Sequence, residues 1–152
     1  MLYLYVMKIF IGTDHAGFEL KNKLYEYLIN KGHDVVDVGP FEYEKLDDYP
    51  DFAFEVATKV IGEDDSKGIL ICTSGQGMAM AANRVRGIRA AVVWDEEAAK
   101  HSREHNDANV ISLPGKRVSE EEAKKIIDTW LETEFTNEER HKRRIAKIEE
   151  FS

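Results

Sequence analysis

The segment from Gly68 to Arg84, GILICTSGQGMAMAANR, restricts the possible folds of this chain more than any other stretch. Its apolar run Gly68–Ile71 is short and rich in β-branched residues, which predicts a buried strand rather than a helix. Small residues follow from Thr73 to Gly77, where glycine lets the backbone turn tightly and approach a ligand. Good helix formers then run from Met78 to Arg84. Such a strand–loop–helix unit directs free backbone N–H groups and the positive helix end at one point, a natural anion site.

Apolar strands and amphipathic helices alternate in the same way along the whole chain. The expected strands are Lys8–Gly12, Val35–Val38, Gly68–Ile71, Ala90–Val93 and Asn109–Leu113. The expected helices are Phe18–Lys31, Pro50 or Asp51 to Ile61, Met78–Arg84, Glu96–His105, a helix to about Trp130 with a Ser119–Glu122 capping box, and a last helix capped by Thr136 or Asn137 that ends near Glu150. Five β-α repeats predict an α/β fold. We expect a three-layer αβα sandwich with a five-stranded, parallel, doubly wound sheet of flavodoxin or Rossmann type, plus a C-terminal helix.

Composition fits a single globular domain over residues 1–152, with 43% hydrophobic and 33% charged residues. The net charge of -8 argues against nucleic acid and against anionic membrane surfaces as partners. No run is long enough to span a bilayer, and the one cysteine excludes an internal disulfide and fits a cytoplasmic location. The apolar opening lacks the features of a signal peptide. Met7 is an alternative start, which would make residues 1–6 an N-terminal extension.

In a doubly wound sheet, ligands bind at the carboxyl ends of the strands. The loops expected at those ends contain Asp14, His15, Cys72, Ser74, Gly75, Gly77 and Asp95. Cys72 is either a small inert hydrophobe or, as a thiolate, a nucleophile or a proton-abstracting base. The Gly75-Gln76-Gly77 loop is no dinucleotide fingerprint, because Met80 occupies the third glycine position and the loop follows the third strand. An ordinary strand-to-helix turn remains the alternative to an anion-binding loop.

Histidine and arginine residues near the helix ends supply further candidates. His101 and His105 have the spacing of a metal pair, but Ser102 stands where the HExxH motif needs glutamate, so a metal site is not expected. His105 could act as an acid or base, or simply cap its helix. Arg140 and Arg144 lie one helical turn apart and would either clamp a phosphate or form a solvated face. We expect His33 and His141 at the surface.

Taken together, these stretches resemble the ribose-5-phosphate isomerase B family, which also includes the galactose-6-phosphate isomerase subunits. The resemblance rests on GTDHAGF (12–18), DYP (48–50), GILIC (68–72), GQG (75–77), AANR (81–84), GIRA (87–90) and SREHND (102–107). These motifs follow one another across nearly the whole chain from Met7. Each is modest alone, but the ordered set is specific, and it is similar to the cysteine-using branch of the family.

The resemblance implies isomerisation of ribose 5-phosphate to ribulose 5-phosphate through an enediol, without metal or organic cofactor. It implies that Cys72 is the base that moves a proton between C1 and C2, and that His105 assists opening of the furanose ring. The other implied catalytic residues are Ser74 and Asp14. The implied substrate and phosphate ligands are Asp14, His15, Tyr49, Thr73, Ser74, Gly75, Gln76, Gly77, Asn106, Arg117, Arg140 and Arg144. It also implies a homodimer or tetramer in which each active site is shared between two subunits.

This sequence departs from the family pattern at three places. Thr73 stands where glycine is usual, and Ser74 stands where threonine is common. The segment Leu113–Arg117 is one residue longer than usual. Two alternatives to the pentose reaction remain open from the sequence: isomerisation of a six-carbon phosphate such as allose or galactose 6-phosphate, and a non-catalytic phosphate-binding module with the same fold.

Overall fold

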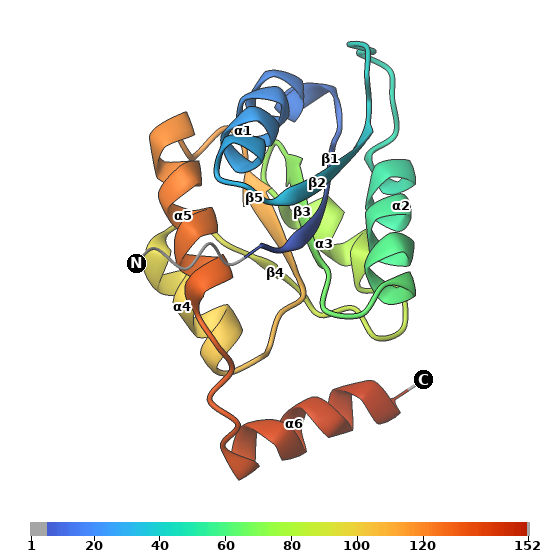
Figure 1. The fold of residues 1–152 in the computed structure, drawn as a ribbon. Coiled ribbons are helices and arrows are strands. Elements are labelled where there is room, and N and C mark those ends of the chain that lie inside the picture. The colour runs from blue at the N-terminus through green and yellow to red at the C-terminus, as the bar shows by residue number, and fades with distance from the viewer. Residues whose placement is uncertain (1–5, 152) are drawn as a thin grey trace.

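Five parallel strands form the middle layer of the computed structural model, which describes residues 6–151 (Figure 1). The strands are β1 (Lys8–Thr13), β2 (Asp34–Gly39), β3 (Lys67–Cys72), β4 (Ala90–Val92) and β5 (Val110–Pro114). They lie in the order β2-β1-β3-β5-β4, and every neighbouring pair is parallel. The predicted α/β sandwich is therefore confirmed. The suggested N-terminal extension, residues 1–6, lies outside the described residues except for Val6.

Helices cover both faces of this sheet. The helices α1 (Phe18–Asn30), α4 (Glu96–Glu104) and α5 (Glu120–Glu132) pack on one face, and α2 (Tyr49–Gly62) and α3 (Gln76–Ala82) pack on the other. A short 3-10 helix, His15–Gly17, precedes α1. The Ser119–Glu122 capping box is present at the start of α5, as predicted. The last helix, α6 (Glu139–Glu150), follows the extended segment after α5 (Figure 1).

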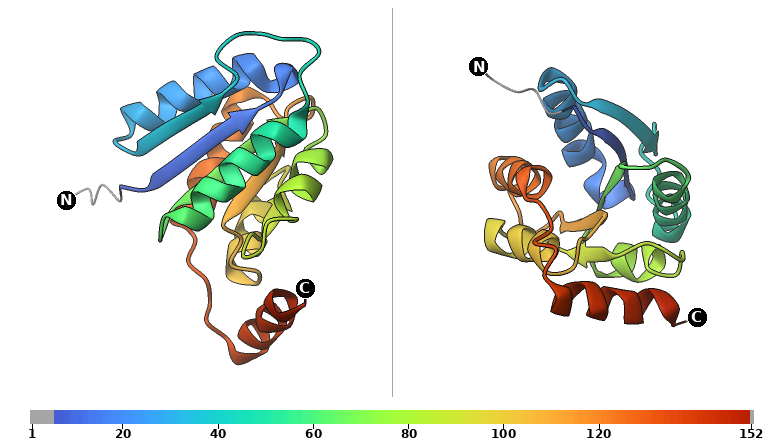
Figure 2. Two further views of the ribbon diagram at one scale, coloured as in Figure 1. Left: turned by 90° about the vertical axis from the view of Figure 1, so that its right-hand side faces the viewer. Right: turned by 60° about the horizontal axis from the view of Figure 1, so that its bottom comes forward.

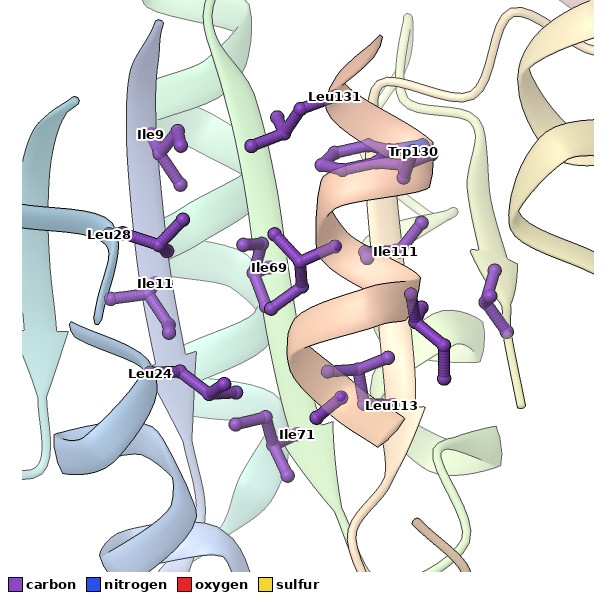
Figure 3. Packing of buried hydrophobic residues seen from close by; sticks show 14 of the residues in the cluster. Ile9, Ile11, Leu24, Leu28, Ile69, Ile71, Ile111, Leu113, Trp130 and Leu131 are labelled. Carbon is purple, nitrogen blue, oxygen red and sulfur yellow. The ribbon is translucent and has the colours of Figure 1, made fainter. Parts of the chain in front are cut away.

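Alternation along the strands sorts the core into two clusters. Ile69 and Ile71 of β3 face α1 and α5, where Figure 3 shows them beside Ile11, Ile111 and Trp130. Leu70 and Cys72, the intervening residues, face α2 and α3 instead. Both sets are buried, as is usual for a parallel sheet with helices on each side. The strand period thus turns the Cys72 side chain toward the α3 side of the sheet.

A fully buried lysine fastens α1 to the end of β2. Lys21 donates hydrogen bonds to Asp37 at 3.0 Å and to the Pro40 carbonyl at 2.7 Å. The hydrogen bond to Pro40 fixes the start of the loop from Phe41 to Asp48, which leads into α2. The position of that loop matters for the site described below.

Several predicted helix boundaries were off by one to a few residues, and two differences have clear causes. The helix α3 begins at Gln76, two residues before the predicted start. It ends at Ala82 because the next side chain, that of Asn83, bonds both the N–H and the carbonyl of Ala90. The predicted caps of the last helix, Thr136 and Asn137, were wrong, since Glu138 is the N-cap. Thr136 instead donates its hydroxyl hydrogen to the Glu104 carbonyl, and Asn137 has a left-handed backbone with φ of 61°.

The helix α6 stands apart from the main body, as the left panel of Figure 2 shows. His141 is its one buried residue, whereas Ile148 is 57% exposed. Its attachments are few: His141 packs on His105, Arg89 pairs with Glu149, and the segment before the helix bonds to the end of α4. An amphipathic helix with so little of its apolar surface covered by the same chain is suited to packing on another molecule.

Candidate active site

The loop after β3 wraps its backbone around the cysteine at the strand end. The Cys72 side chain is buried, and the Gly75 N–H donates a hydrogen bond to its Sγ at 3.2 Å. Gly75 has φ of 78°, a left-handed conformation that other residues adopt with strain. An added Cβ there would also approach the Ser112 carbonyl oxygen to 3.1 Å. Glycine is therefore required for the turn that brings this N–H group to the sulfur.

The neighbouring strand β5 holds this loop in place. The buried Ser112 hydroxyl donates to the Gly75 carbonyl at 2.6 Å, and the Gly115 N–H donates to the Cys72 carbonyl at 2.8 Å. The Lys116 N–H bonds the Thr73 carbonyl at 3.2 Å, which brings the segment that carries Arg117 beside the loop. Ser112 was not predicted as a site residue from the sequence. A small polar residue inside an otherwise apolar strand was the available signal.

The loop after β1 supplies Asp14 and His15. The Asp14 carboxylate accepts the Ala16 N–H at 3.0 Å and caps the short helix, and the residue is only 8% exposed. Burial raises the pKa of Asp14, an effect that the Ala16 hydrogen bond and nearby His15 partly offset. The His15 ring contacts Asp47 through Nδ1 at 2.8 Å. A carboxyl group and an imidazole are thus brought to the same edge of the sheet as Cys72.

Tyr49 closes the other side of this region from the start of α2. Its ring packs directly on Gly77, because a Cβ added at Gly77 would lie 2.6 Å from the tyrosine Cζ and 2.9 Å from its hydroxyl oxygen. Gly77 is thus needed for close approach of the two helices. The structure therefore gathers ten of the predicted site residues around the carboxyl ends of the strands: Asp14, His15, Tyr49, Cys72, Thr73, Ser74, Gly75, Gln76, Gly77 and Arg117.

The other four predicted residues, His105, Asn106, Arg140 and Arg144, lie at the opposite end of the sheet. The helix α4 starts at the carboxyl end and runs back over nine residues, about 13 Å, so that His105 lies near the amino end of β5. In Figure 1, α6 lies at the foot of the molecule and the loop between β2 and α2 at its top. One chain therefore presents two separate groups of predicted site residues.

Three histidines stack at this second group. The His105 ring lies between those of His101 and His141, with ring centroids 5.1 Å and 4.7 Å away. The expectation that His141 lies at the surface was wrong: it is 5% exposed because α6 brings it onto His105. Desolvation, and then the nearby Arg140 charge, lower the pKa of His141. Arg140 and Arg144 themselves are exposed on α6 and available to a ligand.

Residues 6–151 lack the features of two further kinds of site. In this part of the chain, no group of three or more His, Cys, Asp or Glu side chains is placed to hold a metal ion. Within the same range, no helix is both long enough and apolar enough to cross a membrane.

Comparison with known proteins gives consistent matches over almost the whole chain. The ribose/galactose isomerase family matches residues 9–148. Ribose-5-phosphate isomerase B of Mycolicibacterium paratuberculosis is 41% identical over 145 residues, which cover 95% of this chain and 91% of the relative. Two solved structures superpose with a TM-score of 0.91: ribose-5-phosphate isomerase B of Clostridium thermocellum (45% identity, covering 95% of this chain and 96% of that one) and the Mycoplasma genitalium enzyme with bound ribulose-5-phosphate (46% identity, 95% of each chain).

Proposed function

Because the chain belongs to the ribose/galactose isomerase family, we propose that it interconverts ribose 5-phosphate and ribulose 5-phosphate. The observation that carries this function is the environment of Cys72, a lone thiol at the carboxyl end of β3 whose Sγ accepts a hydrogen bond from the Gly75 N–H. An aldose–ketose isomerase needs a base beside a site that binds a developing negative charge. The loop from Thr73 to Gly77 provides the donors for such a site.

The reaction is a proton transfer without net oxidation. The Cys72 thiolate removes the proton from C2 of the open-chain aldose, and the electrons of that C–H bond form the C1–C2 double bond. The aldehyde oxygen then carries the negative charge of the enediolate. The proton of the C2 hydroxyl passes to the C1 oxygen, and the thiol returns its proton to C1 as C2 becomes the ketone. Since the charge develops mainly in the transition state, donors from the Thr73–Gly77 loop accelerate the reaction.

The remaining roles follow from the chemistry of each side chain. The Ser74 hydroxyl can move a proton between the two enediol oxygens, and Asp14 accepts a hydrogen bond from a sugar hydroxyl. Tyr49 contacts the sugar from the start of α2. His15 and Arg117 bind the phosphate from the same chain.

We propose that a second copy of the chain completes each site with His105, Asn106, Arg140 and Arg144. Two features support a homodimer, alone or paired into a tetramer. The two groups of site residues lie at opposite ends of the sheet, and α6, which carries both arginines, leaves Ile148 and Phe151 exposed. His105 of the partner would assist opening of the furanose ring. A cytoplasmic location is part of the proposal because the chain has one cysteine and its substrate is phosphorylated.

The test is conversion of ribose 5-phosphate to ribulose 5-phosphate without added metal, by wild type and by Cys72→Ala. We expect turnover in the wild type and a loss of about 10²- to 10⁴-fold in the variant, the usual contribution of a general base. The variant should keep its circular dichroism spectrum and its affinity for substrate. Equal turnover by both proteins would show that Cys72 is not the base. If the protein converted allose 6-phosphate or galactose 6-phosphate but not ribose 5-phosphate, its substrate would be a six-carbon sugar phosphate.

A further inference from the structure

A buried carboxylate in an otherwise exposed loop holds the ring of His15. Asp47 lies in the Phe41–Asp48 loop, where most side chains are exposed, yet its own side chain is only 8% exposed. Its Oδ1 accepts two hydrogen bonds from His15, one from the backbone N–H at 3.2 Å and one at ring Nδ1, 2.8 Å away. Two donors of one residue thus converge on one oxygen, across 32 positions of sequence.

The second oxygen of this carboxylate shows how much depends on His15. Asp47 Oδ2 is buried and has no hydrogen-bond partner among the described residues. His15 is therefore the group that compensates the burial of this carboxylate. An ionised carboxylate only accepts hydrogen bonds, so Nδ1 must carry the hydrogen. Nε2 is then the ring nitrogen left for a ligand.

Other contacts restrict the ring further. Tyr43, from the same loop, meets the imidazole edge-on with ring centroids 6.0 Å apart. Asp14 is another charged group near His15. The loop itself is anchored at its beginning, where the buried Lys21 bonds the Pro40 carbonyl. The His15 side chain nevertheless stays 31% exposed, so a ligand can reach it.

We propose that Asp47 is a positioning residue for phosphate binding, which fixes the His15 ring with Nδ1 as its donor so that Nε2 faces the phosphate of the substrate. The inference rests on the proposed function, in which His15 is a phosphate ligand. Phosphate oxygens accept hydrogen bonds, so Nε2 also carries hydrogen in the complex. Asp47 is then the counter-ion of an imidazolium whose two N–H groups are both engaged.

The kinetic test separates positioning from a general structural role. For Asp47→Ala we expect KM for ribose 5-phosphate to rise by about tenfold or more, the scale of a lost charge-assisted hydrogen bond, with kcat within about threefold of wild type. Asp47→Asn should raise KM less, because its amide oxygen can still accept from both His15 donors. Glu42→Ala, an exposed carboxylate of the same loop, is the matched control and should leave both constants unchanged.

A double-mutant cycle tests whether Asp47 acts through His15. In a His15→Ala background, Asp47→Ala should cause no further rise in KM. Additive losses would overturn the proposal, as would an unchanged KM for Asp47→Ala or a KM for Asp47→Asn as high as that for Asp47→Ala.

Nitrogen NMR of the imidazoles provides a readout that does not require turnover. In wild type without ligand, the His15 ring should carry its hydrogen on Nδ1, and in Asp47→Ala this preference should be lost. The same tautomer in both proteins would contradict the positioning role. If wild type showed no isomerase activity while this NMR difference persisted, the proposed function would be wrong but the Asp47–His15 contact would stand.

Discussion

Lys67 is a half-buried ammonium whose surroundings oppose its charge. It begins β3, and its Nζ lies 5.9 Å from the centre of the Trp130 ring. Burial first, and then the nearby Arg103 charge, lower the pKa of Lys67 to about 8 from 10.5. Lys67 has no ion-pair partner among the side chains of the described part of the chain. The favourable ring contact therefore offsets little of the desolvation.

This shift predicts a pH-dependent stability. Between about 8 and 10.5 the unfolded chain binds more protons at Lys67 than the folded chain does, so its contribution to stability rises with pH. Below pH 8 Lys67 is protonated in the folded state as well, where its half-buried ammonium is unfavourable. Lys67→Met should therefore raise the free energy of unfolding at pH 7 by about 1 kcal/mol, and the gain should shrink toward pH 10.5.

Urea unfolding at pH 7 and at pH 10 measures this difference. Lys59→Met, at an exposed position on α2, is the control and should show no such pH dependence. A Lys67→Met variant that is less stable than wild type at pH 7 would show that the aromatic contact outweighs the desolvation.

Residues differ in how far sequence alone predicts them. The requirement for glycine at Gly75 follows from local turn geometry and was foreseeable. The contact of Asp47 with His15, and the burial of His141 against His105, join residues more than 30 positions apart. Asp47 lies in a polar loop without periodicity, so no local pattern marks it. Such contacts depend on tertiary packing and were missed for that reason.

Among the helices and strands, hydrophobic periodicity predicted all five strands and six main helices. The capping box of α5 was also predicted, because Ser119 and Glu122 interact within one turn. The start of α6 was not, since the Thr136 hydroxyl donates to the Glu104 carbonyl of α4 and accepts from the N–H of Glu138, the N-cap, rather than from an N–H within the helix. Helix ends were predicted well where the capping partner is local and poorly where it comes from another element.

The contact between α2 and α3 depends on the absence of a side chain at Gly77. A Cβ at this position would overlap the Tyr49 ring at 2.6 Å. Gly77→Ala should therefore displace Tyr49 from the site, lower kcat/KM by about tenfold, and destabilise the fold by about 1–3 kcal/mol through overpacking. Steady-state kinetics and thermal unfolding check both effects.

Gly62→Ala is the matched control for this prediction. Gly62 ends α2, and an added Cβ there would meet no atom within 4 Å. This change should leave activity intact and alter stability by less than about 1 kcal/mol. Full activity of Gly77→Ala would show that Tyr49 can move without harm to the site.

The whole molecule presents its predicted site residues in two groups that cannot meet within one chain. Six-residue strands of about 17–20 Å separate the Cys72 end of the sheet from the end that carries His105 and α6. The fold class was predicted from the sequence and is confirmed, whereas the roles of both groups of residues stay predictions. The residue patterns alone do not show their separation, because it depends on the direction in which α4 returns along the sheet; only the resemblance to the family implied a site shared between two subunits. In the proposed homodimer, each chain would complete the site of the other.

Subunit complementation tests this account most directly. One inactive variant carries Cys72→Ala, and a second carries His105→Ala together with Arg144→Ala. If each site takes Cys72 from one chain and the other two residues from its partner, equal amounts refolded together should recover about a quarter of wild-type ribose 5-phosphate isomerase activity. Each variant refolded alone should remain inactive. A mixture no more active than the separate variants, with mixed oligomers demonstrably formed, would contradict a site shared between subunits.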